Sequence, residues 1–412
     1  MEDNILKQNL LKAIKKTKNT VQKKISFTNI PNIINDLSKK LKNDQYKPSK
    51  FSCFAVKDPK IREIFAPDYK DRVIHHFVLN YINCIDKKFI DDCYSNRKNK
   101  GIHKGVKRLQ KFMHKKNQYY LMADIKTFFP SINKEILYNL ILNHVKSIEE
   151  LSCEEKNIVL NLLEKIVFQD PIKPLPVFKG NRKNLSLVPK EKSLFYSSKD
   201  VGLPIGSLTS QFFANIYLNE LDQFIKHKLK IKYYIRYVDD FIILANDTKT
   251  LLMIKDQVQN FLYEKLKLTL HPKKIVIQHK SKGINFLGYI VKENYILIRK
   301  RTVKSFKRKL YFFNHLLDPI NFPIKDIPVT LNLGKKYQRK EITPPIDPDL
   351  AFLQKVLAVL NSYYGIFSFA STYNLRKTLY QKHFHHLKKY FLPKNNYKIL
   401  KINSAFIKKR KS

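Results

Sequence analysis

Hydrophobic residues recur at helical spacing near the start of the chain and alternate with polar residues soon afterwards. Within residues 1–48, apolar positions three or four apart predict two helices, one over 5–14 and one over 33–41. Between 51 and 67 apolar and polar residues alternate, and Lys57-Asp58-Pro59-Lys60 interrupts them with a sequence typical of a tight turn. This stretch is expected to form a β-hairpin. Two more helices are predicted after it, over 72–89 and 101–113.

Two later apolar segments end in carboxylates. Asp124 closes an aromatic-rich run, and Asp239 and Asp240 lie between the apolar runs 231–236 and 241–245. The pattern predicts three strands, with the paired aspartates in the turn between the last two. Aspartate is common in turns because its side chain caps the backbone, so the pair alone favours neither a structural nor a functional role. Together with Asp124, however, carboxylates at the ends of neighbouring strands could bridge two Mg²⁺ ions for phosphoryl transfer.

The remaining stretches alternate between helices and loops. Asn133 and an acidic residue shortly after it predict the capped start of a helix. Residues 168–201 contain four prolines and few apolar runs, which is typical of a long loop with a functional role. A helix over 209–229 has apolar residues that fit one face. Beyond Arg301 the chain is helical and basic, with a proline-rich loop at 318–348.

The charge balance indicates a polyanionic partner. The chain has 412 residues, of which 43% are hydrophobic and 12% aromatic, enough to fill a substantial core. Its 79 lysines and arginines against 34 aspartates and glutamates give a formal charge of +45. An excess this large favours binding to nucleic acid, although a general preference for lysine at solvated positions would give the same composition.

The cysteines and the N-terminus favour a cytoplasmic protein. The four cysteines lack Cys-x-x-Cys spacing, so neither a zinc site nor a disulfide framework is predicted, and we expect reduced, mostly buried thiols. The first residues lack a charged region followed by an apolar core. No apolar run approaches the ~20 residues that span a bilayer, so we expect no membrane partner.

A series of short motifs occurs in a distinctive order along the chain. The motifs lie at 57–64, 71–76, 124–132, 202–211, 237–240, 271–274 and 285–289. Together they resemble the motifs of reverse transcriptases, specifically of the bacterial retroelement type, over roughly residues 50 to 380. The resemblance implies an α+β right-hand polymerase with fingers, a palm of antiparallel sheet with helices on one face, and a helical thumb. The implied domains are a basic helical N-terminal extension (1–48), fingers (49–118), a palm (119–295) that contains the loop-rich insertion 168–201, and a basic helical thumb with the C-terminal tail (296–412).

The resemblance also implies a metal site. Asp124 and Asp239 would bridge two Mg²⁺ ions, with Asp240 nearby and the backbone carbonyl of Ile125 as a further ligand. Mn²⁺ would substitute for Mg²⁺.

Further residues are implied to bind the substrates. Lys57 and Arg62 would grip the incoming triphosphate, and the ring of Phe129 would collide with a ribose 2′-hydroxyl, which favours deoxynucleotides. Lys274 would donate a proton to the departing pyrophosphate, although Lys273 is equally near in sequence. Without the resemblance, exposed surface charge stays an alternative for Lys57 and Arg62, and the sequence favours a core role for Phe129. The implied nucleotide-binding residues are Lys57, Arg62, Arg72, Phe129, Gly206, Gln211 and Lys274, and the implied primer- or template-binding residues are Tyr237 and Gly288.

Two positions depart from many retroviral and intron enzymes. Those enzymes have Gln where Ile205 stands and Pro where Gln211 stands. The form found here resembles enzymes of diversity-generating retroelements and several phage-defence reverse transcriptases, and the loss of an amide near the nucleotide predicts low fidelity. The expected partners are a structured non-coding RNA template encoded nearby and held by phosphate contacts, the cDNA product, and dNTPs. We expect a role in antiphage defence, with a diversity-generating retroelement as the alternative.

Three other functions are compatible with parts of this pattern. An RNA-dependent RNA polymerase shares the aspartate boxes, but Phe129 and the 202–211 motif argue against it. A catalytically silent nucleic-acid scaffold is disfavoured because all three carboxylates are present. A template-independent or protein-primed DNA polymerase of the abortive-infection type has the same motifs, because motifs do not identify the primer.

Overall fold

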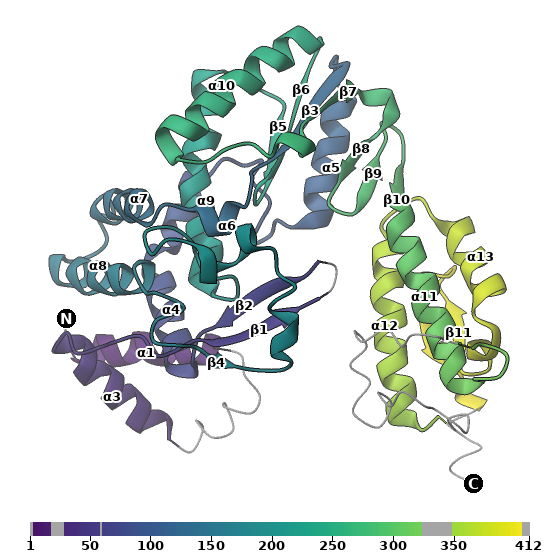
Figure 1. Ribbon diagram of the computed structural model, residues 1–412, viewed down its shortest axis with the longest axis horizontal. Helices are drawn as coiled ribbons and strands as arrows, with labels where there is room; N and C mark the ends of the chain where they lie inside the picture. The colour runs from purple at the N-terminus through teal and green to yellow at the C-terminus, as the bar shows by residue number, and fades with distance from the viewer. Residues whose placement is uncertain (1–2, 18–28, 58–59, 324–347, 406–412) are drawn as a thin grey trace. The chain divides into compact units, whose positions relative to one another are not determined.

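The described part of the chain forms two compact units. The computed structural model describes residues 3–17, 29–57, 60–323 and 348–405 (Figure 1). The first unit is Met1–Gly101 with Tyr119–Gln278, and the second is Ile102–Gln118 with His279–Ser412. The functional division into fingers, palm and thumb stays a prediction, and most of the loop expected at 318–348 lies outside the described residues.

The first unit is built on a four-stranded sheet in the order β5-β6-β3-β7. β6 pairs antiparallel with both β3 and β5, and α10 (Thr248–Leu266) packs against β3 and β6. The three strands predicted from the apolar runs are confirmed, together with the turn between the last two. The four strands of the sheet are β3 (Tyr119–Asp124), β5 (Tyr234–Tyr237), β6 (Asp240–Ala245) and β7 (Val276–His279).

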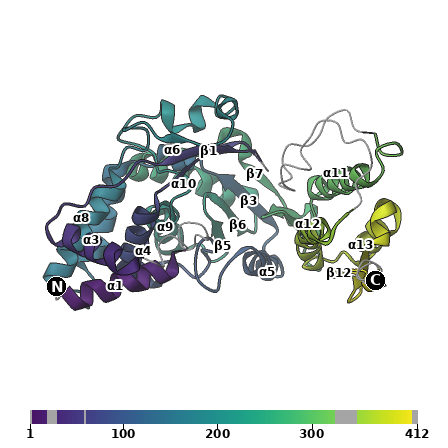
Figure 2. The ribbon, with the colours of Figure 1, turned by 90° about the horizontal axis from the view of Figure 1, so that it is seen from below.

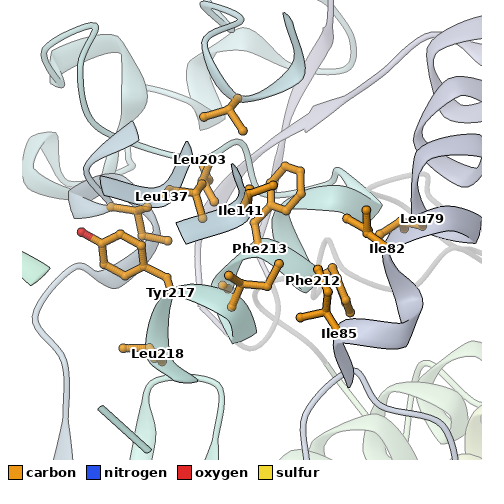
Figure 3. Close-up of a cluster of buried hydrophobic side chains, with 14 of the residues drawn as sticks. Leu79, Ile82, Ile85, Leu137, Ile141, Leu203, Phe212, Phe213, Tyr217 and Leu218 are labelled. Carbon is orange, nitrogen blue, oxygen red and sulfur yellow. The ribbon is translucent and has the colours of Figure 1, made fainter. Parts of the chain in front are cut away.

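A helix buried on nearly all sides forms the centre of this unit. α9 (Leu208–Gln223) packs its aromatic residues, Tyr217 among them, with apolar side chains of α4 (Tyr69–Ile82) and α7 (Lys134–Lys146), as Figure 3 shows. The prediction of a single apolar face was wrong, because polar residues such as Asp222 are buried along with the aromatic ones. α9 therefore carries polar groups that must find partners inside the protein.

Helices close to α9 follow the sequence predictions with small changes. α4 ends at Ile82 and continues as the 3₁₀ turn Asn83–Lys88, so it is shorter than predicted. The side chain of Asn133 caps α7 as predicted, accepting a hydrogen bond from the amide of Ile136 at 2.9 Å. The two N-terminal helices are confirmed, and the first of them packs against α4 (Figure 2). The bounds are α1 (Asp3–Lys16), α3 (Ile30–Lys42) and α8 (Cys153–Val167), the last of which packs against α7.

A second sheet combines the predicted hairpin with the loop-rich segment. β1 (Ser52–Val56) pairs antiparallel with β2 (Arg62–Ala66), and β4 (Val177–Phe178) adds a parallel strand on the other side of β1. Residues 168–201 otherwise consist of loops and single 3₁₀ turns, as predicted. They nevertheless pack tightly, because Leu194 lies in an apolar cluster with residues of β1 and β2.

The second unit is helical and basic, as predicted, but it also contains strands. α5 (Ile102–Met113) packs against the three-stranded sheet β10-β9-β8, and the hairpin β11-β12 packs on α12 (Leu350–Ser368). The remaining bounds are β8 (Ile284–Phe286), β9 (Tyr289–Val291), β10 (Ile296–Ile298), α11 (Lys300–Leu317), α13 (Tyr373–His383), β11 (Phe391–Lys394) and β12 (Ile399–Ile402).

One helix contradicts the expectation that no segment could span a bilayer. By length and composition, α12 is the one helix among the described residues that could cross a membrane. Its buried residues, such as Leu353, Leu360 and Tyr364, pack inside the second unit. A core helix of a soluble protein has the same properties, so α12 is weak support for a membrane span.

The cysteines match their prediction in part. All four are free thiols, as expected. Cys53 and Cys93 are buried, Cys84 is partly buried and Cys153 is exposed, so burial holds for only two of them.

Candidate active site

The three predicted carboxylates meet at one end of the four-stranded sheet. Asp124 ends β3 and Asp240 begins β6, and the two are direct partners across the antiparallel pair. Asp240 is also paired with Tyr237, so Val238 and Asp239 form a two-residue turn between β5 and β6. Antiparallel partners lie about 4.5–5.5 Å apart, so the strand register alone brings these residues together.

Mutual repulsion shapes the electrostatics of the three carboxylates. Burial and the charge of Asp124 raise the pKa of Asp239 to about 6, while the charges of Lys274 and Arg62 oppose this rise. Burial, the charge of Asp239 and a hydrogen bond with Asp124 also raise the pKa of Asp240. The side chain of Asp240 reaches solvent, so the charges of the neighbouring carboxylates are a main cause of its raised pKa. The metal-free site therefore retains protons close to neutral pH.

A lysine from a neighbouring loop partly neutralises this cluster. The ammonium of Lys274 lies 2.5 Å from Oδ2 of Asp124. Its segment runs beside the end of β3, where the amide of His271 donates to the carbonyl of Asp124 at 2.8 Å. The sequence did not distinguish Lys273 from Lys274, whereas the structure assigns the contact to Lys274.

The donor set of the cluster fits a hard divalent cation, although the side chains do not converge on one. Carboxylate and carbonyl oxygens are the ligands that Mg²⁺ prefers. Throughout the described ranges, no three His, Cys, Asp or Glu side chains are grouped closely enough to hold a metal ion. In this structure Lys274 occupies one oxygen of Asp124 instead. Ile125 is buried and its backbone bridges to Leu270, and its role as a ligand stays a prediction.

The basic residues predicted to grip a triphosphate lie on or near the β1-β2 hairpin. Arg62 begins β2 and is exposed, and its charge lowers the pKa of Asp239, so it acts on the carboxylate cluster. Lys57 follows β1 directly and is exposed. Arg72 lies in α4 with its guanidinium 6.0 Å from the centre of the Tyr69 ring. The role of all three residues in holding a triphosphate stays a prediction.

The Phe129 segment and the 202–211 motif are joined by backbone hydrogen bonds. Phe129 lies in the short helix α6 (Phe128–Ser131), is partly buried, and accepts a hydrogen bond from the amide of Leu203 at 2.9 Å. At the other end of the motif, Gln211 is exposed on the first turn of α9. These contacts place the predicted sugar-contacting residue beside the loop predicted to bind nucleotide.

Gly206 is in close contact with the β1-β2 hairpin. Its φ of +120° suits glycine, and a Cβ added there would lie 2.7 Å from the carbonyl oxygen of Phe65. The preceding carbonyl, of Ile205, accepts a hydrogen bond from the amide of Phe65 at 2.7 Å. The loop therefore contacts β2 directly, and only glycine fits.

The two residues predicted to contact primer or template belong to different units. Tyr237 ends β5 and is partly buried, and burial raises its pKa. Gly288 lies between β8 and β9 in the second unit with a φ of +96°. Their roles stay predictions.

The sequence did not reveal two buried polar contacts that hold the surroundings of the site. Glu63 of β2 is buried and accepts hydrogen bonds from Ser193 Oγ at 2.7 Å and from the amide of Leu194, which attaches the loop-rich segment to the hairpin. His75 of α4 is 3.2 Å from Ser207 Oγ, at the start of α9, and burial lowers the pKa of this histidine to about 3. The available sequence signal of these contacts was a charged or polar residue, Glu63 or His75, within an otherwise apolar run.

A buried ion pair lies directly beneath the β5-β6 turn. Arg236 of β5 and Asp222 of α9 are both fully buried and form a two-pronged pair, with distances of 2.7 and 2.5 Å. The hydroxyl of Tyr234 also donates to Asp222, at 2.7 Å. The available signal was a single arginine in the apolar stretch that leads to the aspartates.

Comparisons with known proteins agree with this geometry. Residues 47–291 match the family described as reverse transcriptase (RNA-dependent DNA polymerase). Because the match covers more than half of the chain, the chain belongs to the reverse transcriptase family, and its α+β fold is the fold expected for that family.

The similarity to individual proteins is distant. Group II intron-encoded protein LtrA of Lactococcus lactis subsp. cremoris is 23% identical, over 79% of this chain and 63% of LtrA. The retron Ec73 reverse transcriptase of Escherichia coli is 27% identical, over 48% of this chain and 54% of that protein. A solved structure of apo telomerase from Candida tropicalis is also similar. The alignment includes 86% of this chain and 66% of the telomerase chain, with 13% identity and a TM-score of 0.45. The chain thus spans less than two thirds of the length of the two curated relatives.

Proposed function

We propose that the chain is an RNA-directed DNA polymerase that synthesises cDNA on an RNA template by two-metal phosphoryl transfer. The observation that carries this proposal is the register of β3 and β6, which sets Asp124 opposite Asp240 and leaves Asp239 in the adjoining turn. All three lie inside the part of the chain that matches the family. Membership of that family supports an RNA template and deoxynucleotide substrates.

We assign each of the predicted site residues a task in this proposed reaction. Two Mg²⁺ ions, when bound to Asp124, Asp239 and Asp240, supply Lewis-acid stabilisation of the attacking and leaving oxygens. Arg62 and Lys57 would hold the triphosphate, the arginine as a two-pronged donor and the lysine as a point charge. Lys274, whose ammonium lies 2.5 Å from Oδ2 of Asp124, would give a proton to the departing pyrophosphate.

Primer extension on a defined RNA template tests the proposal. We expect deoxynucleotide incorporation dictated by the template, lost on chelation with EDTA and restored by Mg²⁺ or Mn²⁺. Incorporation that ignores the template would favour a template-independent or protein-primed DNA polymerase of the abortive-infection type. If folded protein incorporated nothing on any of several RNA templates, the proposal would be wrong.

Phe129→Val is expected to admit ribonucleotides. A smaller side chain removes the clash with the 2′-hydroxyl and leaves the carboxylates untouched, so selectivity for dGTP over GTP should fall by about 10–200-fold, equivalent to 1–3 kcal/mol. Competition between the two nucleotides in primer extension measures this ratio. The matched control is Phe128→Leu, because Phe128 is a buried neighbour whose loss should lower stability without changing the ratio. An unchanged ratio in the Phe129 variant would leave that ring a packing role only.

We further propose that the template is a structured non-coding RNA encoded nearby and that the cDNA acts in antiphage defence. The support for this proposal is the loop-rich segment 168–201 and the predicted long basic thumb, because we expect minimal copying to need neither. The second candidate, a low-fidelity enzyme of a diversity-generating retroelement, is favoured by Ile205 and Gln211. Sequencing RNA and cDNA bound to the immunoprecipitated protein, with and without phage, separates them. Errors concentrated opposite adenines, without phage protection, would decide for the second.

A further inference from the structure

We propose that Arg236 is a positioning residue that fixes the catalytic turn of Val238 and Asp239 before any metal or nucleotide binds. This inference rests on the proposed function for its consequence in catalysis, but the geometry that carries it is independent of that function. The side-chain hydrogen bonds of Arg236 within the described residues go to Asp222, Asn215 and the carbonyl of Val238, not to the carboxylates of Asp124, Asp239 or Asp240. Arg236 acts through the backbone of the turn.

The guanidinium of Arg236 joins the core of the first unit to the turn. Its Nε and Nη2 donate to the two oxygens of Asp222, and Nη1 lies 3.3 Å from Oδ1 of Asn215, both on α9. The same Nη1 donates to the backbone carbonyl of Val238 at 2.9 Å. A planar guanidinium presents its donors in a fixed fork, so the position of α9 determines where this last donor lies.

The carbonyl that Arg236 holds belongs to the peptide group immediately before Asp239. Val238 has a φ of +55°, a left-handed conformation that β-branched residues rarely adopt. A two-residue hairpin turn of this kind normally has glycine or asparagine at that position. The valine turn thus needs an external contact to keep its conformation, and the hydrogen bond from Arg236 supplies one.

The strand that carries Arg236 is itself anchored on its other edge. The amide of Arg236 donates to the carbonyl of Asp92 at 3.0 Å, and its carbonyl accepts from the amide of Tyr94 at 3.0 Å. β6 holds the opposite edge of β5. With both edges of the strand held, the hydrogen bond from the buried Arg236 to the Val238 carbonyl connects the turn itself to the core. Preorganisation of this kind lowers the ordering that cation binding would otherwise require.

Replacing the whole buried polar cluster tests the inference while preserving the core. Arg236→Met with Asp222→Leu and Tyr234→Phe removes both charges and the hydroxyl together, since exchanging a buried ion pair for apolar side chains is often neutral for stability. The first readout is hydrogen exchange of the turn amides, 237–241, in the metal-free protein, and we expect it to accelerate by about 10-fold or more. The second is Mn²⁺ binding followed by electron paramagnetic resonance, which should weaken by about 10-fold.

Two variants separate positioning from a general loss of stability. Tyr234→Phe alone removes one partner of Asp222 but leaves the bond from Arg236 to the Val238 carbonyl, so turn exchange and Mn²⁺ affinity should stay within about twofold of wild type. Arg236→Lys keeps a positive charge beside Asp222, but a single ammonium cannot contact both Asp222 and the Val238 carbonyl. This variant should therefore show the same faster hydrogen exchange of the turn amides as the triple variant. If either the apolar triple variant or Arg236→Lys is folded and shows wild-type turn exchange and Mn²⁺ affinity, the inference is wrong. Both readouts need no polymerase activity, so a protein inactive on RNA would contradict the proposed function and leave this test standing.

Discussion

Asp239→Asn together with Asp240→Asn is expected to reduce deoxynucleotide incorporation by more than about 10³-fold while RNA binding survives. The two amides keep the size of the carboxylates but remove the charges that would hold the cations. The measurement is single-turnover primer extension, with RNA affinity followed separately by filter binding. Asp256→Asn is the matched control, since Asp256 is an exposed carboxylate of α10 paired with Lys255, and its loss should leave incorporation unchanged. Substantial incorporation by the double variant would contradict the assignment of these residues.

The same double variant should fold at least as stably as wild type. The pKa of Asp239, about 6 in the folded protein, lies above its value of about 3.9 in an unfolded chain. The folded state then binds more protons between these two values, so this group makes the metal-free protein progressively less stable as pH rises from about 4 to 6. Asparagine does not titrate, so unfolding in urea at pH 5 and pH 7 should show a smaller loss of stability in the variant. A variant that loses more stability than wild type on raising the pH would contradict the raised pKa.

Gly206→Ala is expected to lower the free energy of unfolding by about 2–4 kcal/mol and to reduce kcat/KM for dNTPs by about 10²-fold. The added methyl group would meet backbone atoms of Phe65, which cannot rotate away, so either the loop or β2 must shift. A shift of β2 carries Arg62 with it, which links the packing change to the proposed triphosphate contact.

Gly101→Ala is the matched control for this steric effect. Gly101 has a φ of +114°, close to that of Gly206, but a Cβ added there would meet no atom within 4 Å. It should therefore show only the conformational cost of about 1–2 kcal/mol and normal kinetics. Urea unfolding and steady-state kinetics of the two variants separate the steric cost from the conformational cost. If Gly206→Ala and Gly101→Ala changed stability and kcat/KM equally, the contact between Gly206 and Phe65 would contribute nothing to either.

The parts of the fold that the sequence predicted are those governed by local patterns. Apolar runs located β3, β5 and β6, and the side chain of Asn133 located the start of α7. The carboxylates could be grouped because strand ends are local features and β3 and β6 are adjacent in the sheet.

The parts that the sequence did not predict depend on contacts between distant segments. Neither the pairing of β4 with β1 nor the attachment of Leu194 to Glu63 has a local signal, so the packing of residues 168–201 was missed. The burial of Asp222 was missed because a polar residue in a helix is normally placed on its exposed face. Arg236 provides the ion-pair partner that offsets this burial, and only the three-dimensional fold reveals that pairing.

The pairing of β4 with β1 has a consequence for how the β1-β2 hairpin is held. The sheet that carries Lys57 and Arg62 consists of two stretches separated by more than a hundred residues, and Glu63 attaches the second stretch to the first. The segment then returns beside α6, where the amide of Gly202 donates to the carbonyl of Ile132 at 2.8 Å. Between these attachments, Gly180 follows β4 and is exposed. The position of the hairpin that carries Lys57 and Arg62 therefore depends on residues more than a hundred positions further along the chain.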